Sequence, residues 1–190
     1  ALMVAKAGAD ILGFNFYTKT PRYIEPDTAR DAVAQLRSQL GEQCPVLVGL
    51  FVNATGSKIT EIRNYVGLDF AQLSGDESDT LLKELRGRAF KSIRPASMEL
   101  ATSDVAYFAP TFPTDERVPS LILDAYHPNL YGGTGETASV DVALNVKQQV
   151  PRMMLAGGLN PENVAERVKA IQPWGVDVAS GVEDGTPGLK

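Results

Sequence analysis

Short apolar runs alternate with amphipathic stretches along all 190 residues of the chain, and this alternation restricts the fold more than any other feature. Hydrophobic residues recur at helical spacing between the runs, as Ala29, Val33 and Leu36 do. Continuous apolar strands separated by such helices are typical of a parallel sheet covered by helices, so the sequence predicts an α/β fold. The seven strands that we expect cover residues 11–16, 46–52, 70–73, 90–93, 121–123, 153–156 and 176–179.

The last two predicted strands end in small residues that suit anion binding. One runs into Gly157-Gly158 and the other into Ser180-Gly181. Because glycine has no Cβ atom, backbone N–H groups there can approach a ligand closely. Asn160 is expected to cap the helix that follows the first exit, and a helix N-terminus attracts anions. Two such exits, one βα unit apart, hold phosphate in the last two loops of (β/α)8 barrels.

The two ends of the chain agree with a barrel that is not complete. Residues 1–8 look like the end of a helix that no strand precedes, and the chain stops in a loop after the seventh strand. We therefore expect residues 1–190 to form a single TIM-barrel domain that lacks the first strand and the last helix. A complete, doubly wound open sheet is the alternative, but it does not explain the helix at the start.

Composition excludes several classes of partner. The net charge is −5 and no basic run exists, which argues against nucleic acid as a main partner. No apolar run approaches the roughly 20 residues of a membrane span, so we expect no membrane partner. Cys44 is the single cysteine, so no disulfide framework can form, and a reducing cytoplasm is the expected location.

Polar residues near the strand ends are the candidates for chemistry, because ligands meet parallel α/β folds at the carboxyl ends of strands. Asp124 directly follows a strand and suits a general acid, although a helix cap or an ion pair would explain it equally well. Arg22, after the first predicted strand, can hold a carboxylate by two hydrogen bonds or can simply be solvated. Asp177, in the last strand, is either structural or faces the barrel mouth.

A glycine-rich segment and a lone histidine follow Asp124. Tyr131-Gly132-Gly133-Thr134-Gly135 is either a loop that orders over substrate or a plain surface turn. His127 is the only histidine and has no obvious partner, so solvent exposure is the simpler interpretation. No His, Cys and Asp cluster has metal-ligand spacing, and we predict no metal site.

Taken together, the strand junctions resemble those of the phosphoribosylanthranilate isomerases, a (β/α)8 family of tryptophan biosynthesis. Eight motifs match in order along nearly the whole chain. They are 7–14 (AGADILGF), 16–23 (FYTKTPRY), 48–53 (VGLFVN), 72–77 (QLSGDE), 121–125 (LILDA), 131–135 (YGGTG), 156–159 (AGGL) and 175–183 (GVDVASGVE).

The resemblance implies an Amadori rearrangement of N-(5-phosphoribosyl)anthranilate that needs an acid and a base but no cofactor and no metal. It implies that Asp124 is the general acid, that Arg22 holds the anthranilate carboxylate and that Asp177 contacts the substrate. A small phosphorylated molecule is then the expected ligand. The residues that match the family's phosphate-binding positions are Gly157, Gly158, Ser180 and Gly181.

Some positions depart from the family pattern. The family's general base is a cysteine that ends the first strand, which is expected before residue 1, and Cys44 belongs to a different loop. Ser74 stands where the family usually has histidine, and Ala179 replaces the first serine of the last loop. We expect the chain as given to be inactive and poorly stable, because an open barrel exposes strand edges and core surface.

Two other functions stay open at this point. One is another phosphate-binding barrel enzyme such as indoleglycerol-phosphate synthase, and the other is a non-catalytic phosphate-binding module. Fusion to another enzyme of the pathway is also left open by the sequence.

Overall fold

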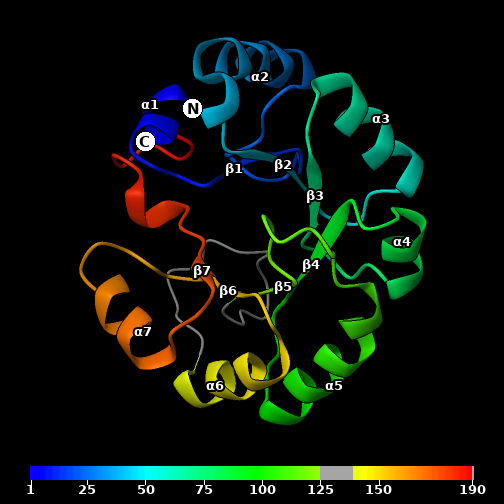
Figure 1. Ribbon diagram of the computed structural model, residues 1–190, viewed down its shortest axis with the longest axis vertical. Helices are drawn as coiled ribbons and strands as arrows, with labels where there is room; N and C mark the ends of the chain where they lie inside the picture. Colours follow the sequence, from blue (N-terminus) through cyan, green and yellow to red (C-terminus); the bar gives the residue numbers. More distant parts are fainter. Residues whose placement is uncertain (125–138, 190) are drawn as a thin grey trace. The chain divides into compact units, whose positions relative to one another are not determined.

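The computed structural model describes residues 1–124 and 139–189 (Figure 1). The chain divides into two compact units, residues 1–89 and 90–190. In each unit, strands and helices alternate and all paired strands are parallel, so the predicted α/β class is confirmed. The single domain predicted for residues 1–190 stays a prediction.

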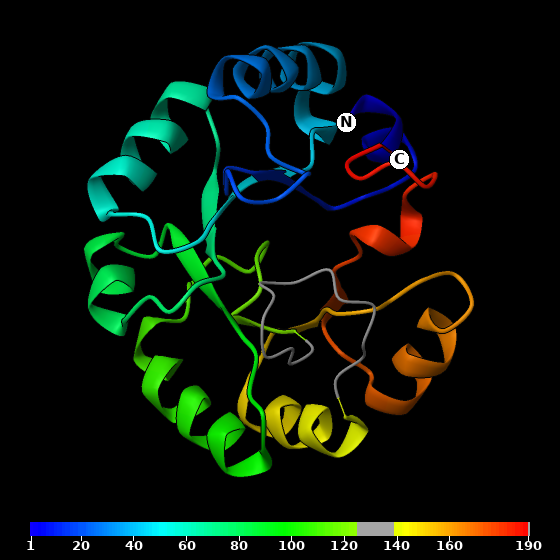
Figure 2. The same cartoon turned by 180° about the vertical axis from the view of Figure 1, so that it is seen from behind.

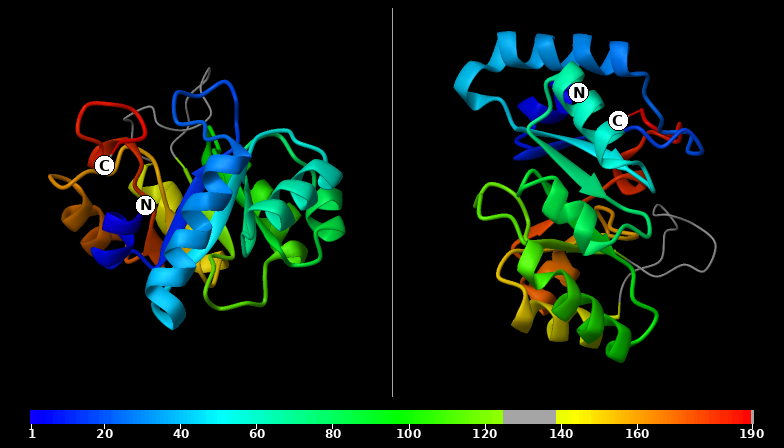
Figure 3. Two further views of the ribbon diagram at one scale, coloured as in Figure 1. Left: turned by 90° about the horizontal axis from the view of Figure 1, so that it is seen from above. Right: turned by 90° about the vertical axis from the view of Figure 1, so that its right-hand side faces the viewer.

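The first unit contains a parallel sheet with β2 between β1 and β3. The helices α2 and α3 pack against each other on one face of these strands (Figures 1 and 3). The elements, in chain order, are α1 (Leu2–Lys6), β1 (Ile11–Asn15), α2 (Pro26–Leu40), the 3₁₀ turn η1 (Gly41–Gln43), β2 (Val46–Phe51), α3 (Gly56–Val66), β3 (Phe70–Leu73) and α4 (Asp79–Glu84).

The helix α3 shows how local sequence fixes the ends of an element. Thr55 is its N-cap, and the Thr55 hydroxyl accepts a hydrogen bond from the Lys58 N–H at 3.3 Å. Gly67 ends the helix with a left-handed φ of 82°, a conformation that favours glycine. Between these caps, Ile59 and Val66 point into the core and are almost fully buried.

The second unit contains the strand order β4-β5-β6-β7, with the helices α5, α6 and α7 packed in sequence beside it (Figure 2). The strand β4 begins at the last residue of the first unit. The elements are β4 (Ala89–Ile93), α5 (Met98–Phe108), the 3₁₀ turn η2 (Ala109–Thr111), β5 (Leu121–Leu123), α6 (Val140–Gln149), β6 (Met153–Leu155), α7 (Val164–Ile171), β7 (Gly175–Val176) and the 3₁₀ turn η3 (Ser180–Val182).

The predicted strands are confirmed, and most of their boundaries agree within two residues. β7 is shorter than expected, since it covers only Gly175–Val176. The helix at the start of the chain is also confirmed, although it ends at Lys6 rather than at Gly8. The predicted start of α7 was wrong: its N-cap is Asn163, because Asn160 caps a separate turn that precedes the helix.

The region 96–118, which the sequence left without a clear prediction, contains α5, and this helix packs beside a buried cation of β4 that the sequence did not predict. Lys91 of β4 is only 4% exposed, and its Nζ donates to the Ser92 carbonyl oxygen at 3.1 Å. The Lys91 ammonium also lies 5.9 Å from the ring centre of Phe108 on α5. Burial raises the pKa of Asp104, on the same helix, and the positive charge of Lys91 opposes that rise. A charged group thus lies inside the β4–α5 layer.

None of the described helices combines the length and the apolar character that crossing a membrane requires.

Candidate functional site

The carboxyl ends of the strands in the second unit lie side by side, and the predicted residues Asp124 and Asp177 lie among them. Backbone hydrogen bonds continue the parallel ladder one residue beyond the strands, so that Asp124, Ala156 and Asp177 occupy one level. Since neighbouring strands are about 4.8 Å apart, the two aspartates flank Ala156 at a backbone separation of roughly 10 Å. The three bonds join Asp124 N to Ile93 O at 2.9 Å, Ala156 N to Leu123 O at 2.8 Å, and Asp177 N to Leu155 O at 2.9 Å.

Asp124 and Asp177 are both half-buried at this edge, and both take part in further polar interactions. A half-buried carboxyl group in this position is partly withdrawn from solvent. The structure therefore places Asp124 where the sequence predicted it, directly after β5.

The loop after β6 has a backbone that only glycine adopts easily. Gly157 has a φ of 91° and Gly158 a φ of 59°, both in the left-handed region. The Asn160 side chain then accepts hydrogen bonds from the N–H groups of Glu162 at 3.1 Å and Asn163 at 3.0 Å. These bonds close a tight turn before α7, so the loop has a defined shape.

The exit of β7 packs directly on the exit of β6. A Cβ atom built on Gly181 would lie 2.0 Å from the carbonyl oxygen of Leu159 and 2.9 Å from the Cα atom of Asn160. Such distances are far below van der Waals contact, so only glycine fits at position 181. The sequence predicted that glycine at this exit lets a ligand approach the backbone. In the structure, Gly181 is required because the backbone of Leu159 and Asn160 in the neighbouring loop leaves no room for a Cβ atom.

Several backbone N–H groups of these two loops are available to a ligand. Within the part of the chain that the structure describes, the N–H groups of Gly157, Gly158 and Leu159 donate to no protein acceptor. Ser180 and Gly181 open the 3₁₀ turn η3, where the first N–H groups have no partner inside the turn. A cluster of such donors matches the oxygen atoms of a phosphate group.

Arg22 lies in the first unit, in a loop that folds back onto the end of β1. The backbone N–H of Ile24 donates to the Asn15 carbonyl oxygen at 2.9 Å, and Tyr23 forms an isolated bridge with Asn15. Arg22 itself is half-buried, and its N–H lies 3.4 Å from the Thr20 hydroxyl oxygen. The loop thus holds Arg22 near the carboxyl end of β1, as the sequence predicted.

A buried carboxylate in the first unit is a feature that sequence reasoning missed. Glu77 is 7% exposed and accepts hydrogen bonds from the N–H groups of Asn53 at 2.8 Å and Gly75 at 2.9 Å. The Asn53 side-chain oxygen in turn accepts from the Asp76 N–H at 2.7 Å. These bonds tie the loop after β2 to the loop after β3. Ser74, in the same loop, accepts from the Gln72 side chain at 3.2 Å.

Other sequence candidates lie away from these strand ends or outside the described residues. Cys44 precedes β2 by two residues and so lies at the amino end of that strand. His127 and the segment 131–135 fall outside the described residues. In the described ranges 1–124 and 139–189, no group of three or more His, Cys, Asp or Glu side chains has the arrangement of a metal site.

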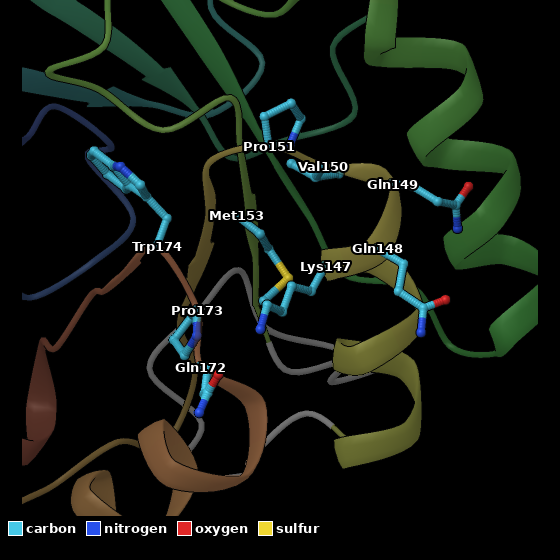
Figure 4. A pocket seen from close by; sticks show the side chains of 9 residues that line it. All are labelled: Lys147, Gln148, Gln149, Val150, Pro151, Met153, Gln172, Pro173 and Trp174. Carbon is cyan, nitrogen blue, oxygen red and sulfur yellow. The ribbon is translucent and has the colours of Figure 1, made fainter.

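A pocket of about 300 Å³ lies at the other end of β6 and β7 (Figure 4). The segment 147–151 lines one side of it, and Gln172, Pro173 and Trp174 line the other, with Met153 between them. These residues precede the strands or, in the case of Met153, begin one, so the pocket is separate from the candidate site.

The amino-acid chain matches the N-(5'-phosphoribosyl)anthranilate (PRA) isomerase family over residues 1–190. A protein of this name from Citrifermentans bemidjiense is 42% identical over 190 residues, which cover all of this chain and 84% of the relative. Another, from Chlorobaculum parvum, is 39% identical over 195 residues and covers all of this chain and 83% of the relative.

Solved structures agree with the sequence comparison. The phosphoribosyl anthranilate isomerase of Thermotoga maritima superposes on all of this chain and 88% of its own, with a TM-score of 0.83 and 31% identity. A second structure of such an isomerase contains reduced 1-(o-carboxyphenylamino)-1-deoxyribulose 5-phosphate. It covers all of this chain and 87% of its own, with a TM-score of 0.79 and 30% identity.

Proposed function

Because the chain belongs to the N-(5'-phosphoribosyl)anthranilate isomerase family, we propose that it uses the strand ends described above to convert N-(5-phosphoribosyl)anthranilate into 1-(2-carboxyphenylamino)-1-deoxyribulose 5-phosphate. This isomerase activity belongs to tryptophan biosynthesis, and the relatives at about 40% identity carry the same name. The observation that supports the proposed site most is the pair of adjacent exits after β6 and β7, which pack on each other at Gly181 while the N–H groups of Gly157, Gly158 and Leu159 donate to no acceptor among the described residues.

The chemistry requires one acid and one base. The acid gives a proton to the furanose ring oxygen, and the bond from that oxygen to C1 breaks as the anthranilate nitrogen supplies an electron pair. The base then takes the proton from C2, and the resulting enol-amine rearranges to the ketone with no net change in atoms. Neither step requires oxidation or reduction, so two side chains and a binding site for the substrate are sufficient.

Asp124 is proposed as the acid, since its half-buried carboxyl lies at the end of β5 beside the exit of β6. Arg22 is proposed to hold the anthranilate carboxylate, which a guanidinium group binds by two parallel hydrogen bonds. Asp177 lies at the level of Asp124 and is proposed to contact the substrate. The proposed phosphate ligands are the backbone N–H groups of Gly157, Gly158, Ser180 and Gly181.

The family also supports a finer description of the fold and its setting. We propose that the seven strands are part of a (β/α)8 barrel, since the likeness to the solved isomerases covers the whole chain. A biosynthetic enzyme of this kind is expected in the cytoplasm. Cys44, the only cysteine, lies at the amino end of β2 and cannot act at the carboxyl ends of strands. The 190-residue chain is therefore proposed to lack the family's general base.

The decisive experiment adds N-(5-phosphoribosyl)anthranilate to the purified full-length protein and identifies the product by chromatography and NMR. Substrate and product have the same mass, so a new species of unchanged mass supports the isomerase. The 190-residue chain is assayed alongside, and turnover by it alone would contradict the proposed absence of the base.

Two added compounds separate the two other functions. Indoleglycerol-phosphate synthase closes its ring onto a C2 ketone and releases carbon dioxide and water, so it would leave N-(5-phosphoribosyl)anthranilate unchanged but would convert added 1-(2-carboxyphenylamino)-1-deoxyribulose 5-phosphate into a product of lower mass. A non-catalytic module would bind the reduced 5-phosphate compound without converting any substrate. Either result with the full-length protein would overturn the proposed isomerase.

A further inference from the structure

We propose that Asn163 is the positioning residue of the phosphate site: its side chain orients the loop after β6 so that the loop's N–H groups face the ligand. This inference rests on the proposed function, since it concerns the phosphate group of the same substrate. Asn163 is the N-cap of α7 and is half-buried, and it stands three residues after Asn160 and four after the buried Leu159.

The Asn163 side chain holds the loop on both sides of Leu159. Its Oδ1 atom accepts a hydrogen bond from the Asn160 N–H at 3.0 Å, and its Nδ2 atom donates to the Gly158 carbonyl oxygen at 2.9 Å. The Oδ1 atom of Asn160 in turn accepts a hydrogen bond from the Asn163 N–H at 3.0 Å. The side chain of each asparagine therefore binds the backbone N–H of the other, and Asn163 anchors this pair at the start of α7.

These contacts determine where the loop's other polar groups point. A trans peptide unit is planar, so its C=O and N–H groups face opposite ways. When Asn163 holds the Gly158 carbonyl, the N–H of Leu159 must point away from Asn163. When it holds the Asn160 N–H, the Leu159 carbonyl must also point away, and that carbonyl oxygen is the atom against which Gly181 packs.

One side chain thereby sets both halves of the proposed phosphate site. It aims the Leu159 N–H, which adjoins the proposed ligand Gly158 and donates to no acceptor among the described residues, and it sets the surface on which the exit of β7 rests. Both polar atoms of the Asn163 side chain are engaged with the loop backbone, so it acts through the loop and not by touching the substrate.

The test compares two ligands that differ only in the phosphate group. The probes are reduced 1-(o-carboxyphenylamino)-1-deoxyribulose 5-phosphate and its dephosphorylated counterpart, and their affinities for the full-length protein are measured by calorimetry. Asn163→Ala should weaken binding of the phosphorylated compound about tenfold, because two loop hydrogen bonds are lost, and should leave the other compound unaffected. Asn163→Asp, which keeps the acceptor but loses the donor, should also weaken only the phosphorylated compound.

Asn145→Ala is the matched control, since Asn145 is a half-buried asparagine of α6 whose bonds are to Thr102 and Gln149, away from the strand exits. It should change neither affinity. Equal losses for both compounds in Asn163→Ala and Asn163→Asp would mean a general loss of structure and would overturn the inference, as would unchanged affinities. If the unsubstituted protein binds neither compound, the proposed function fails first, and the inference fails with it.

Discussion

Gly181 packs against the backbone of Leu159 so closely that a Cβ atom at position 181 would lie 2.0 Å from the Leu159 carbonyl oxygen. The atom in the way belongs to the backbone, and Asn163 holds the peptide units on both sides of Leu159 in place. A larger residue at position 181 therefore has no flexible side chain to push aside, and the two loops would have to separate.

Gly181→Ala should reduce both stability and phosphate binding for this reason. Overpacking typically lowers the free energy of unfolding by about 1–3 kcal/mol. Separation of the loops should also weaken binding of the reduced 5-phosphate compound at least about tenfold. Gly185→Ala is the control: Gly185 has a φ of 103° but no atom within 4 Å of a built Cβ, so it tests backbone strain alone. Phosphate affinity should survive in the control, and a Gly181→Ala protein with normal affinity would refute the close packing as a functional requirement.

Asp124→Asn should remove most of the turnover and leave ligand binding nearly intact. An amide has the shape of a carboxyl group but cannot give a proton to the ring oxygen, and such proton transfers contribute about 10²- to 10⁴-fold to rates. Steady-state kinetics of the full-length protein should therefore show a lower kcat at a similar affinity for the reduced 5-phosphate compound. Turnover close to that of the unsubstituted protein would show that Asp124 is not the acid.

The strands were predictable because burial leaves a direct trace in the sequence. Leu121, Ile122 and Leu123 of β5 are at most 1% exposed, and an unbroken apolar run is what such a strand requires. The helix α5 was harder to predict. Its core residues Ala101, Val105 and Phe108 follow helical spacing, but the weak helix formers Thr102, Ser103 and Asp104 stand between them and prolines follow.

The candidate site was predictable only at the level of position. A polar residue directly after an apolar run marks a strand exit, and Asp124 lies at one, as expected. The contacts of Glu77 and Asn163 were not predictable, because both side chains bind backbone groups of neighbouring loops. The direction of a loop N–H or C=O leaves no trace in residue types, so only coordinates reveal which side chains orient a loop.

Glu77→Gln should destabilise the first unit by about 1–3 kcal/mol, the usual cost of leaving a buried polar group without its partner. The carboxylate presents one oxygen to Asn53 and both oxygens to Gly75, whereas an amide would point its NH₂ group at a backbone N–H. Denaturant unfolding of the full-length protein measures the change. Glu61→Gln is the control, because Glu61 is exposed on α3 and pairs only with Lys58, and it should change stability by less than about 0.5 kcal/mol. Equal effects in the two variants would show that Glu77 does not join the loops.

Asp104→Asn should make the protein more stable at neutral pH and should change how its stability depends on pH. Burial raises the pKa of Asp104 above its usual 3.8, although the positive charge of Lys91 opposes the rise. As pH increases above 3.8, the unfolded chain therefore loses this proton before the folded chain does. The folded state then binds more protons, so the contribution of Asp104 to stability falls until pH exceeds the folded pKa. Asparagine does not titrate in this range, so the stability of the variant should not fall in this way as pH rises.

Glu99 on the same helix provides the opposite case. Hydrogen bonds from its own backbone N–H and from the Ser97 side chain lower the pKa of Glu99. The ionised Glu99 side chain therefore stabilises the folded state when pH is above its usual pKa. This stabilisation is lost as pH falls through the lower pKa that Glu99 has in the folded state. Glu99→Gln should reduce stability at neutral pH and have less effect in acid, which is the reverse of Asp104→Asn. Urea unfolding of both variants from pH 3 to pH 8 checks the pair, and curves that shift in the same direction would contradict the assignment of burial as the dominant cause at Asp104.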